Sequence, residues 1–304
     1  MTLFLEQVLN GLQLGVMLFL MAAGLTLIFG IMGIINLAHG SIYMIGAYAG
    51  TYVAMETGVY YAGIPAALAA AALTGSAMEF LVVRRLYKRD HLDQVLATFA
   101  LILISNQAIT LLFGRQPLFI GMPEALNSSV ELLPGLFYSS YRLAIIAMGL
   151  LVALGLYLVI NRTRIGMLVR AGSTNRDMVR ALGVDIRLLY TIVFGLGALL
   201  AGLAGFMAGP ILAVQVGMGE QILITTFVVV VIGGVGSIRG AFFASLIIGV
   251  FDTMLRAYLP GLLRQVMAGS EADALGAGLS SMGIYLLMAL VLLIRPKGLF
   301  PAHS

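Results

Sequence analysis

The sequence predicts an all-α integral membrane protein, a polytopic helical bundle of eight or nine transmembrane segments with interrupted, glycine-rich helices. Three observations predict this fold class. Of the 304 residues, 61% are apolar and only 10% are charged, and the mean hydropathy is +1.06. Soluble domains carry about 25% charged residues, so this chain has too few charges to cover a globular surface. The apolar runs are continuous rather than alternating, which excludes a transmembrane β-barrel.

Seven apolar runs are long enough to cross the hydrocarbon core, which takes about 20 helical residues. In chain order they are 8–31, 62–83, 92–113, 142–160, 188–209, 240–259 and 277–294. Two further segments, 40–55 and 222–236, are apolar but interrupted or short. The uninterrupted run from Ile222 to Ile232 would extend only about 16 Å as a helix. We therefore expect a partial helix there, completed by irregular backbone.

Basic residues predict the orientation of these segments. They gather in 84–91, in 161–187, at Arg239 and in the tail 295–297. Cytoplasmic loops carry an excess of Lys and Arg, so these stretches and the C-terminus are expected in the cytoplasm. Counting 40–55 as a crossing gives nine crossings and an external N-terminus. A re-entrant segment there gives eight crossings and an internal N-terminus, and both alternatives stay open.

The composition also excludes several kinds of site. The chain has no cysteine, and its three histidines lie far apart in the sequence, so no metal-ligand spacing exists. No phosphate-binding loop and no paired catalytic residues occur, so we expect no enzyme activity and no cofactor bound by this chain. The first residues lack a basic region, and we expect no cleaved signal peptide. One transmembrane domain over 1–304 is predicted, with external loops at 114–141 and 260–276.

The cytoplasmic loop at about 161–187 contains a predicted short helix. Ser173 or Thr174 can cap its start, and Gly183 can end it. Its apolar side chains share one face at helical spacing; they are Met178, Ala181 and Leu182. A short amphipathic helix can lie on anionic lipid or insert into a groove of a partner protein. Because this apolar face is small, we favour the protein groove.

Two membrane segments are punctuated by glycine and polar residues. The candidate residues of the first are Asn36, His39, Gly40 and Ser41. Those of the second are Gly233, Gly234, Gly236 and Ser237. Backbone freed from a helix at membrane depth must be buried in protein or line a wet cavity, and broken helices often mark a transport path. The alternative is that these glycines serve tight helix packing.

Ionisable residues inside the membrane are few. Besides His39, the candidates are Glu79 and Asp252, each close to the end of a predicted helix. Asp252 precedes Arg256 by four residues, a spacing that suits an ion pair on one helix face. A proton relay needs several titratable groups along a path, so structural hydrogen bonding or gating is the favoured role of Asn36 and His39.

Five motifs in register resemble one family. They are Asn36-Leu-Ala-His-Gly40, the loop Arg170…Asn175…Ala181-Leu-Gly183, Ala201-Gly-Leu-Ala-Gly205, Gly233-Gly-Val-Gly-Ser237 and Arg295-Pro-Lys-Gly-Leu-Phe300. Together they resemble the inner-membrane permease subunit of ABC importers for branched-chain amino acids, in its shorter, LivH-like form. The resemblance runs over essentially the whole chain.

This resemblance implies a permease domain over 1–304 in the bacterial inner membrane, with the loop coupled to an ATPase. The implied coupling residues are Arg170, Asn175, Arg176, Asp177, Met178, Arg180, Ala181, Leu182 and Gly183. Implied partners are two ABC ATPase subunits, a second permease that is LivM-like or a copy of this chain, a soluble substrate-binding protein and the lipid bilayer, with no nucleic acid. ATP and Mg would be bound by the partner subunits. Other importer permeases carry a Glu-Ala-Ala…Gly motif, of which only Ala181-Leu-Gly183 remains here.

The resemblance implies branched-chain or other hydrophobic amino acids as the substrate, delivered by the binding protein. Related permeases serve urea, amides or small carboxylates, and this alternative stays open. An ion-coupled secondary transporter or a channel would need carboxylates or coordinating groups embedded mid-span, of which the sequence offers almost none. An intramembrane enzyme would need paired catalytic residues, and only His39 with Asp252 suggests such a pair.

Overall fold

The computed structural model describes residues 2–301, with the side chains of Arg176 and Asp177 left out of the description. The described chain is helical and forms two compact units. Unit 1 comprises 1–22, 124–150 and 225–304, and unit 2 comprises 23–123 and 151–224. Each is described by itself below, and the expectation of one domain over 1–304 stays a prediction.

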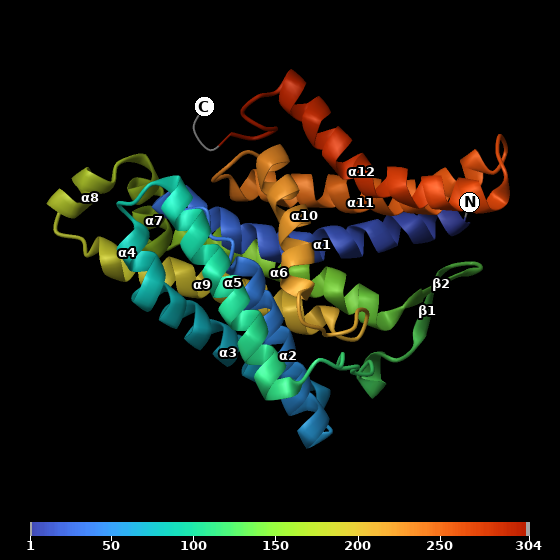
Figure 1. The fold of residues 1–304 in the computed structure, drawn as a ribbon, viewed down its shortest axis with the longest axis horizontal. Helices are drawn as coiled ribbons and strands as arrows, with labels where there is room; N and C mark the ends of the chain where they lie inside the picture. Colours follow the sequence, from blue (N-terminus) through green and yellow to red (C-terminus); the bar gives the residue numbers. More distant parts are fainter. Residues whose placement is uncertain (1, 302–304) are drawn as a thin grey trace. The chain divides into compact units, whose positions relative to one another are not determined.

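The helices fall close to their predicted positions (Figure 1). They are α1 (Thr2–Met32), α2 (His39–Thr57), α3 (Gly63–Met78), α4 (Arg84–Leu86), α5 (His91–Phe113), α6 (Ser140–Arg162), α7 (Arg164–Thr174), α8 (Arg176–Ala181), α9 (Ile186–Ala208), α10 (Met218–Gly233), α11 (Ile238–Leu263) and α12 (Gly269–Ile294). Short helical turns η1 (Tyr60–Ala62), η2 (Glu79–Val83, π-helical) and η3 (Glu124–Leu126) and strands β1 (Ser129–Leu133) and β2 (Leu136–Ser139) complete the set.

Seven helical spans in the described part of the chain are long and apolar enough to cross a membrane, and they match the seven predicted runs, of which only 188–209 extends one residue beyond its helix. The fold class is therefore confirmed. The two doubtful segments are also helical. α2 has 19 residues, and α10 has 16, which is too short to cross alone, as its sequence predicted.

Small residues build the core of unit 2 between α2, α3 and α9. On α3 they recur every four residues, at Gly63, Ala67, Ala71 and Gly75. A side chain added to Gly46 of α2 would meet Gly202 of α9 within 3.0 Å, and one added to Gly202 would meet Ala71. Without large side chains in the way, the three backbones approach closely, as in other small-residue interfaces of membrane helices.

The break after α1 is a turn and an extended stretch, as the glycines predicted. Gly33 ends α1 with a φ of 65°, a value that disfavours other residues. Near that end, Ile31 lies by Gly172 of α7. His39, which begins α2, instead lies beside Gly24. Gly24 is also a neighbour of Gly197, at the middle of α9. Residues 33–38 therefore return along the unit from its α7 end to its middle.

From that midpoint α2 runs to the opposite end of unit 2. Its later residues follow α9 in parallel, because Gly46 packs on Gly202 and Gly50 packs on Phe206. The chain from 33 to 57 thus traverses unit 2 as an extended half and a helical half. This is the arrangement expected if 40–55 belongs to a crossing, and it favours the alternative of nine crossings over a re-entrant segment.

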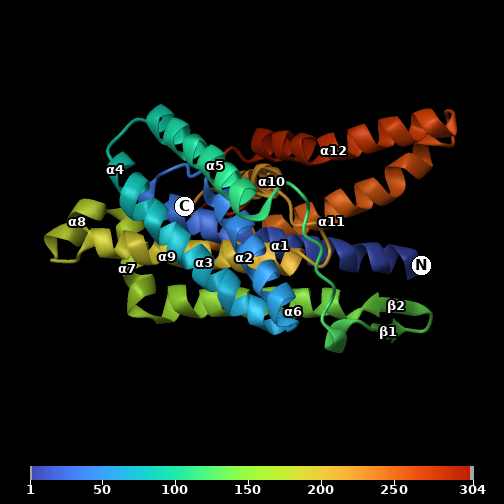
Figure 2. The ribbon, with the colours of Figure 1, turned by 60° about the horizontal axis from the view of Figure 1, so that its bottom comes forward.

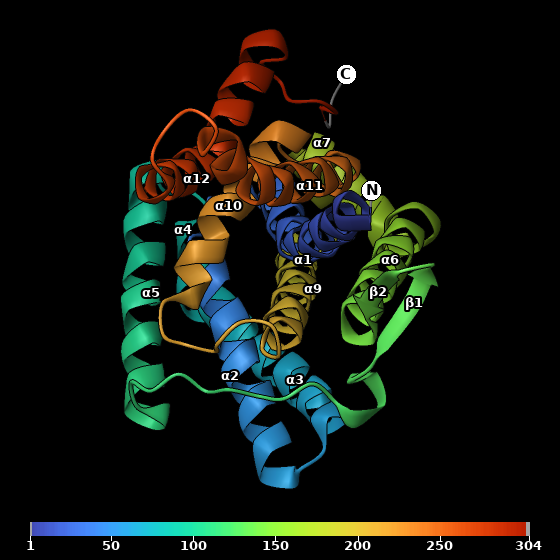
Figure 3. The ribbon, with the colours of Figure 1, turned by 90° about the vertical axis from the view of Figure 1, so that its right-hand side faces the viewer.

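Unit 1 is built on α11 and α12, which run antiparallel and are joined at one end (Figure 2). Gly276 and Gly283 of α12 let it approach Pro260 and Leu255 of α11. The first part of α1 packs on α11 through Gly11, next to Gly249 and Val250. Strands β1 and β2 form an antiparallel hairpin that leads into α6 (Figure 3).

Candidate functional site

The loop at 161–187 folds as two helices, α7 and α8, rather than one. At the start of α7, the hydroxyl of Thr163 accepts a hydrogen bond from the backbone N–H of Gly166 at 3.2 Å. At the start of α8, Oδ1 of Asn175 accepts one from the N–H of Met178 at 3.0 Å. Gly183 has a φ of 83° and follows the end of α8 as predicted.

The predicted cap at Ser173 or Thr174 is wrong. Both hydroxyls donate back to the carbonyl oxygen of Arg170, at 2.8 and 3.1 Å, and both residues stay in the last turn of α7. Asn175 breaks the helix with an extended backbone (φ −151°, ψ 99°) and caps α8 itself. Asparagine is among the best N-cap residues because its short side chain reaches the free N–H groups of the first turn.

The apolar face of α8 is exposed. Met178 is 59% exposed and Leu182 is 76% exposed, and Ala181 beside them is exposed as well. The neighbouring Val179 is buried, at only 4% exposed. α8 is thus anchored by Val179 and presents the predicted apolar face outward.

The polar residues predicted for this loop are partly described. Arg170 and Arg180 are exposed, and Arg170 donates to the carbonyl oxygen of Ile160. The side chains of Arg176 and Asp177 lie outside the described part, although both residues belong to α8. α4, α7 and α8 gather at one end of unit 2 (Figure 1). The two basic segments 84–91 and 161–187 therefore share that end, as the orientation argument requires.

A buried carboxylate links α9 to the π-helical turn at the same end. Glu79 is fully buried, and its Oε2 lies 2.9 Å from Nη2 of Arg84 and 3.0 Å from the hydroxyl of Thr191, which donates to it. Nε of Arg84 donates to Oε1 at 3.2 Å, and the hydroxyl of Tyr87 donates to the same oxygen. Burial, and then this hydrogen bond to Glu79, raise the pKa of Tyr87 well above its ordinary value.

Sequence reasoning noted Glu79 only for its place before the basic run. The pair Glu79–Arg84 is five residues apart, a spacing that an α-helix does not bring together but the π-helical turn Glu79–Val83 does. The contact with Thr191 joins residues 112 positions apart. No local pattern signals either feature.

The first predicted path segment is buried inside unit 2. Asn36 and His39 are both 0% exposed, and Ser41 is 3% exposed. Oδ1 of Asn36 accepts a hydrogen bond from the N–H of Ala38 at 3.1 Å, which fixes the turn before α2. Its Nδ2 has no hydrogen-bond acceptor among the described residues. The polar side chains at this break hold its shape, which fits the structural role that the sequence favoured for Asn36.

Gly40 brings the starts of two helices together. A side chain added there would meet the carbonyl oxygen of Gly219, in the first turn of α10, within 3.0 Å. The next residue, Glu220, accepts a hydrogen bond at Oε1 from Nδ2 of Asn106 on α5, at 2.6 Å. Sequence reasoning missed Glu220, because it precedes the apolar run and reads as a loop residue.

The second predicted path segment lies in unit 1 and turns α10 into α11. Gly234 and Gly236 have φ values of 101° and 82°, and the hydroxyl of Ser237 caps α11 by accepting from the N–H of Gly240 at 3.1 Å. A side chain added to Gly233 would meet the backbone of Gly240 within 3.0 Å. These glycines therefore shape a tight turn, and a role in lining a path stays a prediction.

The C-terminal tail covers this turn. The N–H groups of Leu299 and Phe300 donate to the carbonyl oxygens of Ile232 and Gly233, at 2.8 and 3.0 Å. A side chain on Gly234 would meet the carbonyl oxygen of Phe300 within 3.0 Å. The exposed basic residues Arg239, Arg295 and Lys297 flank the covered turn. The tail motif is thus explained by backbone packing.

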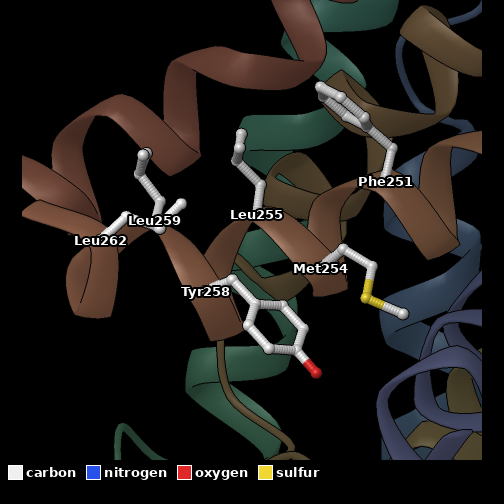
Figure 4. A pocket seen from close by; sticks show the side chains of 6 residues that line it. All are labelled: Phe251, Met254, Leu255, Tyr258, Leu259 and Leu262. Atoms are coloured by element: carbon white, nitrogen blue, oxygen red, sulfur yellow. The ribbon is translucent and has the colours of Figure 1, made fainter. Parts of the chain in front are cut away.

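α11 carries the predicted ion pair and, on its surface, an apolar groove. Nε of Arg256 lies 2.8 Å from Oδ2 of Asp252, which confirms the four-residue pairing. The groove is lined by Phe251, Met254, Leu255, Tyr258, Leu259 and Leu262 (Figure 4). With a single hydroxyl in its lining, it offers almost nothing to recognise a polar solute. Among the described residues, no group of three side chains could hold a metal ion.

Comparisons with known proteins agree with the architecture. The family described as branched-chain amino acid transport system / permease component matches residues 7–294. The high-affinity branched-chain amino acid transport system permease protein BraD of Pseudomonas aeruginosa is 30% identical over 97% of this chain and 95% of its own length. The corresponding LivH of Escherichia coli is 26% identical over the same shares of both chains.

A third relative is similar over slightly less of its length. The probable branched-chain amino acid transport permease protein LivH of Methanocaldococcus jannaschii is 27% identical over 93% of this chain and 88% of its own length. No solved structure matches the chain. One family matches nearly the whole chain, and the chain folds as a polytopic helical bundle. This chain is a membrane-spanning member of the family of permease components of branched-chain amino acid transport systems.

Proposed function

We propose that this chain is the translocation subunit of an ATP-binding-cassette importer in the bacterial inner membrane, and that it carries branched-chain or other hydrophobic amino acids inward. In this proposal the chain binds no nucleotide. Two partner ATPase subunits bind ATP and Mg, a soluble protein delivers the amino acid from outside, and a second permease, LivM-like or another copy, completes the pore. The family match and the names of the relatives support the substrate class.

The observation that carries the proposal is the outward-facing α8. Its apolar residues Met178, Ala181 and Leu182 are exposed at the end of unit 2 that gathers the basic segments. A protein whose apolar helix face is exposed outside the membrane spans offers an anchor for a partner groove. ATP binding and hydrolysis in that partner would move α8, and α7 and α9 would transmit the movement to the membrane part.

In this proposal, the end of unit 2 that carries α7 and α8 also determines how the chain is oriented in the membrane. If α7 and α8 are cytoplasmic, then the N-terminus of α1 and the hairpin β1–β2 lie outside, and the tail with Arg295 and Lys297 lies in the cytoplasm. The external side would receive the soluble binding protein. These placements remain part of the proposal.

The test is to copurify the chain with its native partners, reconstitute the complex in liposomes and measure which solutes stimulate ATP hydrolysis and enter. Leucine, isoleucine or valine should stimulate both. Stimulation by urea, an amide or a small carboxylate instead would keep the importer architecture and change the substrate. Uptake driven by an ion gradient without ATP would contradict the proposal.

A charge on the face of α8 should separate transport from hydrolysis. We expect Ala181→Asp combined with Leu182→Asp to lower uptake by roughly tenfold or more, because an unpaired charge would enter an apolar groove. Solute should then no longer stimulate ATP hydrolysis. The matched control is Ala181→Ser with Leu182→Met, which keeps the face uncharged and should transport normally. Normal uptake by the double aspartate variant at normal membrane levels would show that the ATPase contacts another surface.

A further inference from the structure

The described part of unit 2 contains one deep carboxylate with no cation beside it. Among the described side chains, three acidic residues form ion pairs: Glu79 with Arg84, Asp252 with Arg256 and Asp273 with Arg264. Glu220 takes part in none of the ion pairs that the described residues form. It is half-buried and lies in the first turn of α10.

The neighbours of Glu220 place it within the membrane part of unit 2. Its hydrogen-bond partner Asn106 lies seven residues before Phe113, the end of α5, and so about 10 Å inside that end. Gly219, next to Glu220, contacts Gly40, which starts α2 near the midpoint of α9. An ionisable side chain at such depth is costly and is a candidate functional residue.

One unused hydrogen-bonding atom lies beside this carboxylate, and a second belongs to α2. Oδ1 of Asn106 is buried and has no hydrogen-bond partner among the described residues. Tyr48 is fully buried, and its hydroxyl likewise has no partner in the described chain. The Tyr48 ring packs on Phe113 with ring centres 5.1 Å apart, on the face of α5 that carries Asn106 two turns earlier. Within the described chain, α5 thus leaves one unused polar atom beside Glu220, and α2 leaves another against the end of α5.

A carboxylate held in this way can accept a positive partner. Asn106 satisfies Oε1, whereas Oε2 has no hydrogen bond within the described residues. Oε2 of the half-buried side chain is therefore open to a bound cation. An amino acid carries such a cation in its ammonium group, which has three donors.

We propose that Glu220, oriented by Asn106, binds the ammonium group of the amino acid as it passes through this chain. The inference rests on the proposed function, and it adds the group that the pore itself recognises. Oε2 of Glu220 and Oδ1 of Asn106 are the two free acceptors for the ammonium donors. The site selects for an amine and leaves the apolar side chain of the substrate to the glycine- and alanine-rich surroundings.

The test compares variants that separate charge from hydrogen bonding. Glu220→Gln removes the charge but keeps an oxygen that can accept from Asn106. Asn106→Leu removes the hydrogen bond but keeps the carboxylate. Glu56→Gln, at the exposed end of α2, is the matched control for loss of a carboxylate. Each variant is reconstituted as the complete complex, and the maximal leucine uptake and the half-saturating leucine concentration are measured.

We expect Glu220→Gln to lower maximal uptake about tenfold or more, and Asn106→Leu to lower it less than about threefold. Glu56→Gln should match the unaltered complex. The half-saturating concentration, set by the binding protein, should stay constant throughout. If Glu220→Gln transports normally while Asn106→Leu fails, Glu220 is only a packing contact between α5 and α10, and the inference is overturned.

Two further outcomes are decisive. If Glu220→Gln does not assemble, Glu220→Asp and Asn106→Leu replace it, since both keep a carboxylate and disturb the hydrogen bond. Retained uptake by both supports the ammonium site, and loss of uptake by both overturns it. If the unaltered complex itself moves no amino acid with ATP, the proposed function fails, whatever the variants do.

Discussion

At Gly40, an added side chain would meet the carbonyl oxygen of Gly219 within 3.0 Å, whereas at Gly155 it would meet nothing within 4 Å. Both glycines lie inside helices, α2 and α6, and neither has a positive φ. The sequence offers no way to distinguish them. The first glycine is required by the close approach of two backbones, and the second is not.

We therefore expect Gly40→Ala to destabilise the protein by about 1–3 kcal/mol, because the backbone of α10 cannot move aside as a flexible side chain would. Gly155→Ala should be neutral or stabilise by about 0.5–1 kcal/mol through its better helix propensity. Thermal unfolding of the purified variants in detergent measures both. Equal stability of the two variants would mean that α2 and α10 separate more easily than their packing suggests.

Other single residues show what a sequence can reveal. Asp252 and Arg256 were predicted to pair because helix geometry alone brings positions four apart together. Glu220 was missed because its depth depends on where α2 and α10 meet, a contact between Gly40 and Gly219 that no local pattern encodes. Asn175 was missed as a cap because Ser173 and Thr174 are equally good cap residues by type.

At the scale of elements, the joint between the π-helical turn η2 and α9 depends on one carboxylate. Glu79 is fully buried and accepts hydrogen bonds from Arg84, Tyr87 and Thr191. Removing one partner of a buried ion pair leaves the other charge uncompensated, which costs far more than the loss of a neutral hydrogen bond.

Glu79→Gln should therefore destabilise the protein by about 3 kcal/mol, discounted from the full range because Arg84 is 28% exposed to solvent. Thr191→Val, which removes one hydrogen bond at nearly constant volume, should cost about 1 kcal/mol. Chemical or thermal unfolding in detergent compares them. A Glu79→Gln variant no less stable than Thr191→Val would mean that the ion pair contributes nothing to the joint.

The elements were predictable to very different degrees. Long apolar runs set the seven main spans, and the short run before Gly233 correctly predicted a helix too short to cross. The extended stretch 33–38 was predicted only as a break, because glycines indicate where a helix stops and not where the chain goes next. The hairpin β1–β2 was not predicted, because its region was interpreted only as a proline-containing external loop, although Pro134-Gly135 between apolar residues is a turn signal.

At the scale of the whole molecule, the absence of cysteine from the sequence makes the orientation directly testable. Single cysteines can be introduced without interference at the half-exposed position of Ser173→Cys in α7 and at the exposed positions of Lys297→Cys in the tail and Glu131→Cys in β1. In intact cells, a membrane-impermeant thiol reagent should label only the last. The first two should react after the membrane is opened. Labelling of position 173 or 297 in intact cells would reverse the proposed topology.

The whole-molecule prediction of a helical membrane bundle succeeded because composition alone determines which solvent a chain can tolerate. The packing of the helices inside each unit could not be predicted from the sequence. This packing depends on which glycines face which neighbouring helices. With 37 glycines in the chain, many such pairings fit the local sequence equally well.

The covered turn between α10 and α11 has a consequence for sequence variation. The last carbonyl groups of a helix need donors, and here the main chain at Leu299 and Phe300 supplies them. Main-chain donors are common to every residue except proline, so these two hydrogen bonds exclude only proline, while the Phe300 ring is held separately by Phe243 at 5.3 Å between ring centres. Gly298 cannot be replaced by a larger residue without strain, because its φ is 81° and the backbone of Gly234 lies against it. Related chains should therefore keep the glycine at position 298 and avoid proline at 299 and 300.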